Sequence, residues 1–347
     1  MLRLIVPMSL LGSSVAAQQP SAGGEPPRPS PISQTELFRR LTKSIDSLAA
    51  AGQFSGVAVL AKNGVTIFQR ATGMADRERG IAINGETAFN LGSINKTFTQ
   101  IAILQLRAAG KLDLDSTLVT YWPDYPNKEV ARRITIRQLL RHSSGIGGNI
   151  FDPPAGGKRN DIRTLGDFLP LFVNEPLQFE PGSRNAYSNP GYVVLGLLIE
   201  RLSGSDYYTY VREHIFRPAG MTRTGSFFVD SLPSNTAIGY TRGDENAPAN
   251  TPLRPNFKDL PGRGSSAGGG YSTAHDLVKF VQALREQRIP NGLPPGIGDA
   301  GGSGGVNAIV EGELPGGYDL VVLTNLDPPA AERVARMTRE WLGARDD

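Results

Sequence analysis

Two hairpin patterns, one near each end of the chain, constrain the fold more than any other feature. Near the N-terminus, the apolar runs 54–61 and 65–71 flank Asn63-Gly64, and an Asn-Gly pair between such runs is a strong signal for a β-hairpin. Near the C-terminus, residues 306–310 and 320–324 also alternate and predict a second hairpin. Because each alternating strand has one face to bury, we expect all four strands to join one antiparallel sheet.

Helical patterns accompany both hairpins. Ser33 and Glu36 have the spacing of a capping box at the start of a helix. Four apolar residues then recur at helical spacing: Leu37, Leu41, Ile45 and Leu48. The C-terminal stretch with Val334, Met337 and Trp341 predicts a second helix. We expect these two helices to cover the sheet.

The middle of the chain is rich in helical and loop patterns, whereas strands occur at both ends. This order predicts an α/β (α+β) fold, with an α/β lobe formed by residues 34–87 and 262–347 and a helical lobe, residues 88–261, inserted between them. Residues 34–347 are expected to form this single domain, with a substrate cleft between the lobes.

Ser93 and Lys96 lie three positions apart, just before the apolar run 101–106. If this run is helical, both side chains lie on one face within contact distance. A serine hydroxyl is a poor nucleophile unless a base takes its proton, and a lysine becomes such a base when burial depresses its pKa. A position on the first helical turn also directs backbone N–H groups at a developing oxyanion. Ser-x-x-Lys also arises by chance, as a capping serine and a solvated lysine, so its context decides.

Two further segments supply that context. Tyr187 and Asn189 lie in a loop that contains proline and glycine and precedes a second apolar helix pattern, residues 192–202. Loops held by a rigid scaffold often carry reactive groups. The glycine-rich segment 301–305 precedes the strand pattern 306–310, and a backbone without side chains can approach a substrate closely.

With these three elements, the chain resembles the serine β-lactamase and penicillin-binding-protein superfamily. The resemblance is strongest to the branch of class C β-lactamases, D,D-peptidases and esterases, and it covers most of residues 36–342. It rests on the Ser-x-x-Lys motif at residues 93–96 and the Tyr-x-Asn motif at residues 187–189. Three connecting segments also resemble sequences of the family: residues 139–146, 192–200 and 266–276.

The resemblance implies a β-lactamase/transpeptidase-like fold and acyl transfer through a covalent serine ester. Ser93 would attack the substrate carbonyl, and Lys96 would accept its proton or prepare Tyr187 to do so. Tyr187 would then protonate the leaving group and activate water, while Asn189 would orient Lys96 and the substrate. The backbone N–H groups of Ser93 and Gly302 would form the oxyanion hole.

Two departures from the family pattern bear on activity. The third motif begins with Lys or His in the family but is Asp299-Ala300-Gly301 here, so a carboxylate replaces a cation that helps to hold substrate carboxylates. Only the short stretch 285–297 precedes this motif, where family members have several tens of residues. The carboxylate predicts a weak esterase that prefers short neutral acyl esters to β-lactams and carboxylate-terminated peptides.

Three functions therefore stay open at the level of sequence. A serine hydrolase of small esters or amides is expected first, and a β-lactamase or D,D-peptidase proper uses the same machinery. The third function is that of a catalytically impaired binding protein that retains the fold, and the two departures from the family pattern favour it. The expected partner is a small-molecule ester, amide or peptide substrate.

The N-terminus has the pattern of an exported protein. Residues 1–17 resemble a signal peptide, with Arg3 before the apolar run 4–11, which is too short to span a bilayer. Residues 18–33 form a Pro/Gly/Ser-rich tether. We expect a periplasmic or secreted protein without a membrane span. The net charge of +3 falls to +2 when Arg3 is removed, so no nucleic-acid partner is expected.

Neither a metal nor another cofactor is expected. The chain has no cysteine, and its three histidines lie far apart in sequence: His142, His214 and His275. We predict that His142 packs or forms hydrogen bonds rather than acting as an acid or base. Gly-x-Ser-x-Gly patterns at 264–268 and 301–305 lack the acid and histidine that a nucleophile elbow requires in that order.

Overall fold

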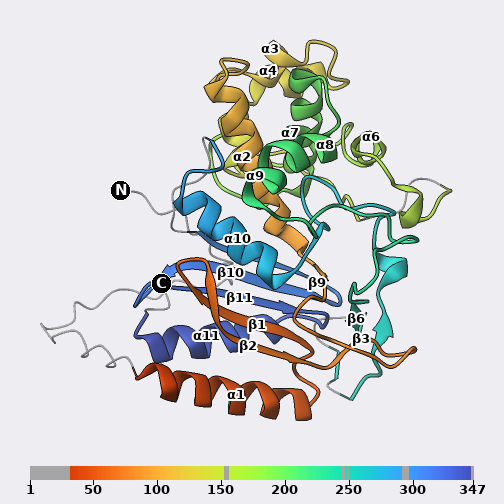
Figure 1. Cartoon of the computed structure of the whole chain (residues 1–347). Helices are drawn as coiled ribbons and strands as arrows, with labels where there is room; N and C mark the ends of the chain where they lie inside the picture. Colours follow the sequence, from red (N-terminus) through yellow and green to blue (C-terminus); the bar gives the residue numbers. More distant parts are fainter. Residues whose placement is uncertain (1–31, 152–155, 244–246, 249, 291–296, 345–347) are drawn as a thin grey trace, which may run out of the picture.

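The computed structural model describes residues 32–151, 156–243, 247–248, 250–290 and 297–344 (Figure 1). The predicted signal peptide, residues 18–31 of the tether and residues 291–296 of the short stretch before the third motif lie outside the described residues. Within the described ranges, no helix is both long and apolar enough to cross a membrane.

A five-stranded antiparallel sheet joins the two ends of the chain, as the hairpin patterns predicted. Its order is β2-β1-β11-β10-β9. The strands are β1 (Gly56–Lys62), β2 (Val65–Thr72), β9 (Gly298–Ser303), β10 (Val306–Leu314) and β11 (Tyr318–Thr324). The two predicted hairpins meet where β1 pairs with β11, from Gly56 opposite Thr324 to Lys62 opposite Tyr318. Asn63 and Gly64 both have positive φ in the first turn, as a tight hairpin requires.

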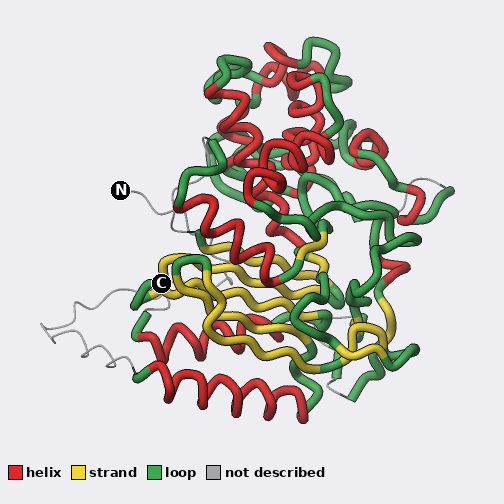
Figure 2. The backbone as a smooth tube through the Cα atoms, in the orientation of Figure 1, coloured by secondary structure: helices red, strands yellow, loops and turns green. Residues whose placement is uncertain are grey.

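Helices cover both faces of this sheet (Figure 2). The helices α1 (Gln34–Ala50) and α11 (Ala330–Leu342) pack on one face, where Leu41 and Val334 lie in one buried cluster with Leu320. The helix α10 (Ala274–Arg285) packs against β1 and β11 on the other face. The expectation of one buried face per strand is therefore wrong for the central strands, since helices on both sides leave β1 buried at six of its seven positions.

The N-terminal helix begins at its predicted cap but with half of the predicted capping box. The Glu36 backbone N–H donates to Ser33 Oγ at 3.3 Å. The Glu36 carboxylate binds Arg39 and Arg40 instead of turning back to the cap, because these guanidinium groups lie one turn away on the same face.

Helices from the middle of the chain lie above the sheet in Figure 1. The longest of them, α2 (Asn95–Ala108) and α7 (Asn189–Ser203), pack against each other. The shorter ones are α3 (Leu118–Tyr121), α4 (Lys128–Arg133), α5 (Ile136–Leu140), α6 (Leu165–Phe168), α8 (Tyr207–Val211) and α9 (Arg217–Ala219). The division into lobes at residues 88 and 261 stays a prediction.

Three pairs of short strands connect these parts. They are β3 (Met74–Asp76) with β4 (Ile81–Ala82), β5 (Phe89–Asn90) with β8 (Tyr271–Ser272), and β6 (Tyr240–Thr241) with β7 (Arg254–Pro255). β5 lies directly before the Ser93 segment in sequence, and its pairing with β8 places that segment beside Tyr271 and Ser272.

Candidate active site

Ser93 lies in a single 3-10 turn, η1 (Gly92–Ile94), between β5 and α2. The backbone N–H of Leu91 donates to Gly270 O at 2.7 Å, and that of Gly92 donates to Asn90 Oδ1 at 2.9 Å. The apolar run 101–106 predicted as helical is part of α2, which has Ile101 fully buried. Ser93 is therefore held at the start of a buried helix, where backbone N–H groups point outward.

Lys96 is buried beside Ser93, with 5% of its surface exposed. Its Nζ donates to Ser93 Oγ at 3.2 Å, to Asn189 Oδ1 at 2.8 Å and to the carbonyl of Ala267. Burial lowers the pKa of Lys96 to about 7, although negative Asp299 acts in the opposite direction. Near neutral pH, a large share of Lys96 is thus the free amine, the form that can accept a proton.

Tyr187 contacts the nucleophile from the open side of the site. Its hydroxyl donates to Ser93 Oγ at 2.6 Å, while 54% of the residue is exposed. Removal of the phenol from water raises the pKa of Tyr187, and Asp299 adds to this shift. The Lys96 Nζ also lies 4.6 Å from the Tyr187 ring centroid. The structure thus brings together Ser93, Lys96, Tyr187 and Asn189, the four side chains that the motifs selected.

His142 holds the segment that carries Tyr187. Its Nδ1 accepts the Ser188 N–H at 3.0 Å, and its carbonyl accepts the Ala186 N–H at 2.8 Å. Its ring stacks on Tyr187 at 4.7 Å and on Tyr192 at 4.9 Å between centroids. Burial and the nearby Lys96 lower the pKa of His142 to about 4, so Nδ1 stays free to accept. The predicted packing and hydrogen-bonding role is confirmed, but its connection to Tyr187 was missed.

The glycine-rich segment forms β9, an edge strand that the sequence patterns did not predict. A Cβ on Gly301 would lie 2.0 Å from Leu91 O and 2.7 Å from the Ser93 backbone nitrogen. A Cβ on Gly92, whose φ is +51°, would lie 2.9 Å from the Gly302 nitrogen. Only glycine allows β9 and η1 to approach this closely. The backbone nitrogens of Ser93 and Gly302 consequently lie in one small region.

Asp299 lies on the sheet face that carries this site. It pairs with Val310, and Gly301 pairs with Ala308, so Asp299 and Gly301 share a face, because directly opposite residues and alternate residues point the same way. Val310 and Ala308 belong to the buried cluster beneath the helical part. Burial raises the pKa of Asp299 to about 7, and Lys96 opposes that shift.

The two alternative serines lie in different surroundings from Ser93. Ser266 is fully buried, and its hydroxyl donates to Tyr192 O at 2.8 Å, which makes it a structural residue. Ser303 is exposed at the end of β9. Ser93 alone of the three has a lysine amine and a phenol within hydrogen-bond distance in the described residues.

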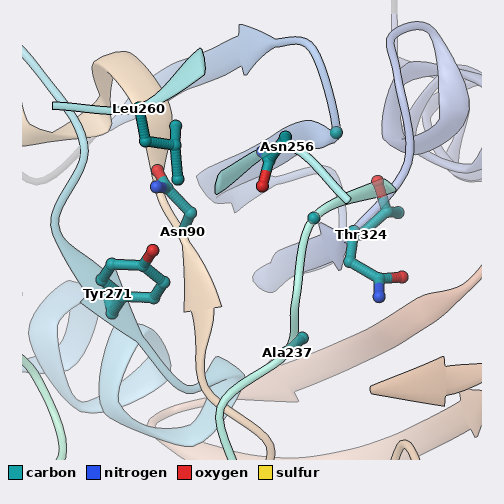
Figure 3. Close-up of a pocket in the computed structure, with 9 residues that line it drawn as sticks. Asn90, Ala237, Asn256, Leu260, Tyr271 and Thr324 are labelled. Atoms are coloured by element: carbon teal, nitrogen blue, oxygen red, sulfur yellow. The ribbon is translucent and has the colours of Figure 1, made fainter. Parts of the chain in front are cut away.

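A small cavity is lined by residues that include Asn90, Tyr271 and Asn256 (Figure 3). Its volume of about 10 Å³ is room for one water molecule. Asn325 also lines it, and its buried Oδ1 has no partner among the described protein atoms. The cavity therefore fits a structural water rather than a substrate.

Comparison with known proteins shows the family. Residues 41–344 match the family profile Beta-lactamase, so the chain belongs to the β-lactamase family, as its motifs predicted. The esterase EstB of Burkholderia gladioli is 30% identical over 346 aligned positions, which cover 90% of this chain and 86% of EstB. PbpX of Bacillus subtilis is 35% identical over 236 residues, 68% of this chain. The chain spans only 56% of PbpX.

Solved structures agree with the predicted fold. A penicillin-binding protein from Bacillus halodurans superposes with a TM-score of 0.72 at 30% identity and covers 84% of this chain and 98% of its own. The D-amino acid amidase of Ochrobactrum anthropi has a TM-score of 0.73 at 22% identity, with 88% and 98% covered. Sequence and fold thus agree on the β-lactamase family.

Proposed function

We propose that this protein hydrolyses small esters or amides through an acyl-enzyme on Ser93, and that it is exported by the leader-like residues 1–17. The observation that carries the catalytic proposal is the contact of Ser93 Oγ with both Tyr187 OH, at 2.6 Å, and Lys96 Nζ, at 3.2 Å. A nucleophile and its base within hydrogen-bond distance are what covalent catalysis requires. EstB, whose name describes an esterase, supports the ester class.

The proposed reaction proceeds in two halves. In the first, Ser93 Oγ forms a bond to the substrate carbonyl carbon, and its proton passes to the Lys96–Tyr187 pair. The bond from the carbonyl carbon to the leaving oxygen or nitrogen breaks as Tyr187 returns a proton to the leaving atom. In the second half, the same pair removes a proton from water, whose oxygen forms a bond to the carbonyl carbon of the acyl-enzyme. The bond from this carbon to Ser93 Oγ then breaks as the pair returns the proton to Oγ, which releases the acid and restores Ser93.

Backbone groups supply the electrostatic part of this reaction. The nitrogens of Ser93 and Gly302 lie together where β9 meets η1, so their N–H groups are proposed to bind the oxyanion. Each donor of this kind contributes about 2.7–4 kcal/mol of transition-state stabilisation. Asn189 accepts from Lys96 and thereby directs the amine at Ser93.

Hydrolysis of p-nitrophenyl acetate is expected to be faster than hydrolysis of nitrocefin. Asp299 lies near Lys96, and its charge repels the carboxylate of a β-lactam by about 4 kcal/mol at 4 Å in a partly dry site, whereas a neutral ester avoids this cost. Steady-state kcat/KM for both substrates tests the preference. Faster hydrolysis of nitrocefin would show that Asp299 does not determine which substrate charge the site prefers.

A binding protein without turnover is the second candidate, favoured by the carboxylate at Asp299. A fluorophosphonate probe separates the two functions, because it reacts only with an activated serine. Mass spectrometry should find the adduct on the peptide that contains Ser93. Intact protein without any adduct, together with no ester turnover, would support the binding protein.

Ester hydrolysis is expected to increase as the pH rises through about 7. Lys96 has a pKa of about 7, and only its neutral form accepts the Ser93 proton. Negative Asp299 favours the ammonium form of Lys96, so Asp299→Asn should move the acidic limb of the profile to lower pH. The measurement is kcat/KM for a neutral ester between about pH 5 and pH 9. A shift to higher pH would contradict this coupling.

Replacement of His142 by alanine is expected to lower kcat by about 10- to 100-fold with little change in KM. The variant keeps the backbone carbonyl that holds Ala186 but removes the ring, which accepts the Ser188 N–H and stacks on Tyr187. Small displacements of a catalytic group cost about this much. Steady-state kinetics on a neutral ester gives both constants. His275→Ala is the control, since His275 pairs with Glu86. An equal loss in kcat in His142→Ala and His275→Ala would contradict a positioning role for His142.

A further inference from the structure

The Asp299 carboxyl group lacks a dedicated partner in the part of the chain that the structure describes. No ion pair among the described residues includes it, and its own Oδ1 accepts only a hydrogen bond from the neighbouring Ala300 N–H, at 3.2 Å. The charge of Lys96 acts on it, but Lys96 Nζ already lies within hydrogen-bond distance of Ser93 Oγ, Asn189 Oδ1 and Ala267 O. A carboxylate is thus left available beside the nucleophile.

The register of β9 fixes where this carboxylate lies relative to the reacting carbonyl. Gly301 is packed against the Ser93 backbone nitrogen, and Asp299 lies two residues earlier on the same face of the strand. Two residues of a strand span about 7 Å. An amine carried a few bonds from a carbonyl at Ser93 therefore reaches the Asp299 side chain.

The surroundings of Asp299 favour a cation over a neutral group. Its charge acts on Lys96, Tyr187 and Tyr192, so it is felt throughout the site. Asp299 is half-buried, which weakens screening by water and salt relative to a surface carboxylate. An ammonium group would supply both the opposite charge and hydrogen-bond donors.

We propose that Asp299 is a specificity-determining residue that binds the ammonium group of a small amine-bearing ester or amide. The proposal rests on the hydrolytic function proposed above and narrows its substrate class. It goes beyond the expectation that Asp299 repels anions, because it requires that cationic substrates react faster than neutral ones of the same shape.

Two matched substrate series test the proposal, one for each side of the scissile bond. On the leaving-group side, 2-(dimethylamino)ethyl thioacetate, whose protonated amine keeps one N–H donor, is compared with 3-methylbutyl thioacetate and 3-(acetylthio)propionate, with the released thiol measured by a chromogenic disulfide. On the acyl side, the p-nitroanilides of alanine are compared with those of N-acetyl- and N-succinylalanine, in both D and L forms.

The result is the ratio of kcat/KM for the cationic substrate to that for the neutral one. A charged hydrogen bond of the usual strength gives a ratio of about 10 to 100 in at least one series. Asp299→Asn should bring that ratio close to one. Any effect of the substitution on the pKa of Lys96 cancels in the ratio, because hydrolysis of both substrates depends on Lys96. Glu340→Gln is the matched control, since Glu340 is exposed on α11, on the opposite face of the sheet.

A salt titration of the wild-type protein keeps the test independent of how well Asp299→Asn folds. The cationic preference should fall as NaCl is raised from about 10 mM to about 500 mM, because salt screens the pair. A ratio near one in both series, or one that persists in folded Asp299→Asn, overturns the proposal for Asp299 alone. Absence of Ser93-dependent turnover of every substrate instead overturns the proposed hydrolytic function.

Discussion

Ser93→Ala is expected to abolish ester hydrolysis, with a loss of about 10⁴-fold or more in kcat, together with all fluorophosphonate labelling. The hydroxyl of Ser93 is the atom on which Lys96 Nζ and Tyr187 OH converge, and without it no acyl-enzyme forms. Residues that act as one catalytic unit lose their effect together. Stopped-flow measurement of the burst phase and steady-state rates give the loss of turnover, and mass spectrometry of the probe-treated protein gives the loss of labelling.

Ser303→Ala is the matched control for this loss. Ser303 lies on β9 in one of the two Gly-x-Ser-x-Gly patterns and is exposed, so it tests the alternative nucleophile directly. Its alanine variant should retain the burst and the label. A label that disappears with Ser303 and persists in Ser93→Ala would place the nucleophile on β9.

Lys96→Ala is expected to lower kcat by at least about 10³-fold. The variant removes the buried amine that reaches Ser93 Oγ and leaves Asn189 Oδ1 without this donor. Steady-state ester hydrolysis measures the loss, and thermal unfolding monitors whether the protein stays folded. Lys43→Ala is the control, because Lys43 is exposed on α1.

The double variant distinguishes a shared catalytic unit from two independent effects. If Lys96 acts through Ser93, Ser93→Ala/Lys96→Ala should be no slower than Ser93→Ala alone. A further loss of similar size would mean that Lys96 serves another step. Retention of most activity in folded Lys96→Ala would assign the base to another group, with Tyr187 as the nearest candidate.

Local patterns predicted the parts of this protein that depend on short-range chemistry. Asn63-Gly64 located the first turn, since positive φ at both positions is a property of the residues themselves. The spacing of Ser93 and Lys96 likewise predicted their contact, because three positions are about one helical turn. The membership of four strands in one sheet followed from their alternation, whereas their order was not predicted.

Other parts depend on contacts between distant segments and gave no local signal. β9 contains four small or glycine residues in a row, from Ala300 to Ser303, and becomes a strand because β10 offers a partner edge. The position of His142 between Tyr187 and Tyr192 joins parts of the chain about 50 residues apart. The third acceptor of Lys96, Ala267 O, is a backbone atom that no side-chain motif marks.

Two positions of β9 that share one face have different roles: Gly301 is needed for the reaction rate, and Asp299 is proposed to determine substrate selectivity. Gly301 admits no side chain, since even a Cβ would lie 2.0 Å from Leu91 O, whereas Asp299, two residues away on the same face, already accommodates one. Mutational drift at position 299 can thus change which substrates are accepted while the oxyanion geometry is preserved by the position that cannot vary. A laboratory library confined to position 299 is accordingly the smallest one in which new substrate charges can be selected without rebuilding the catalytic centre.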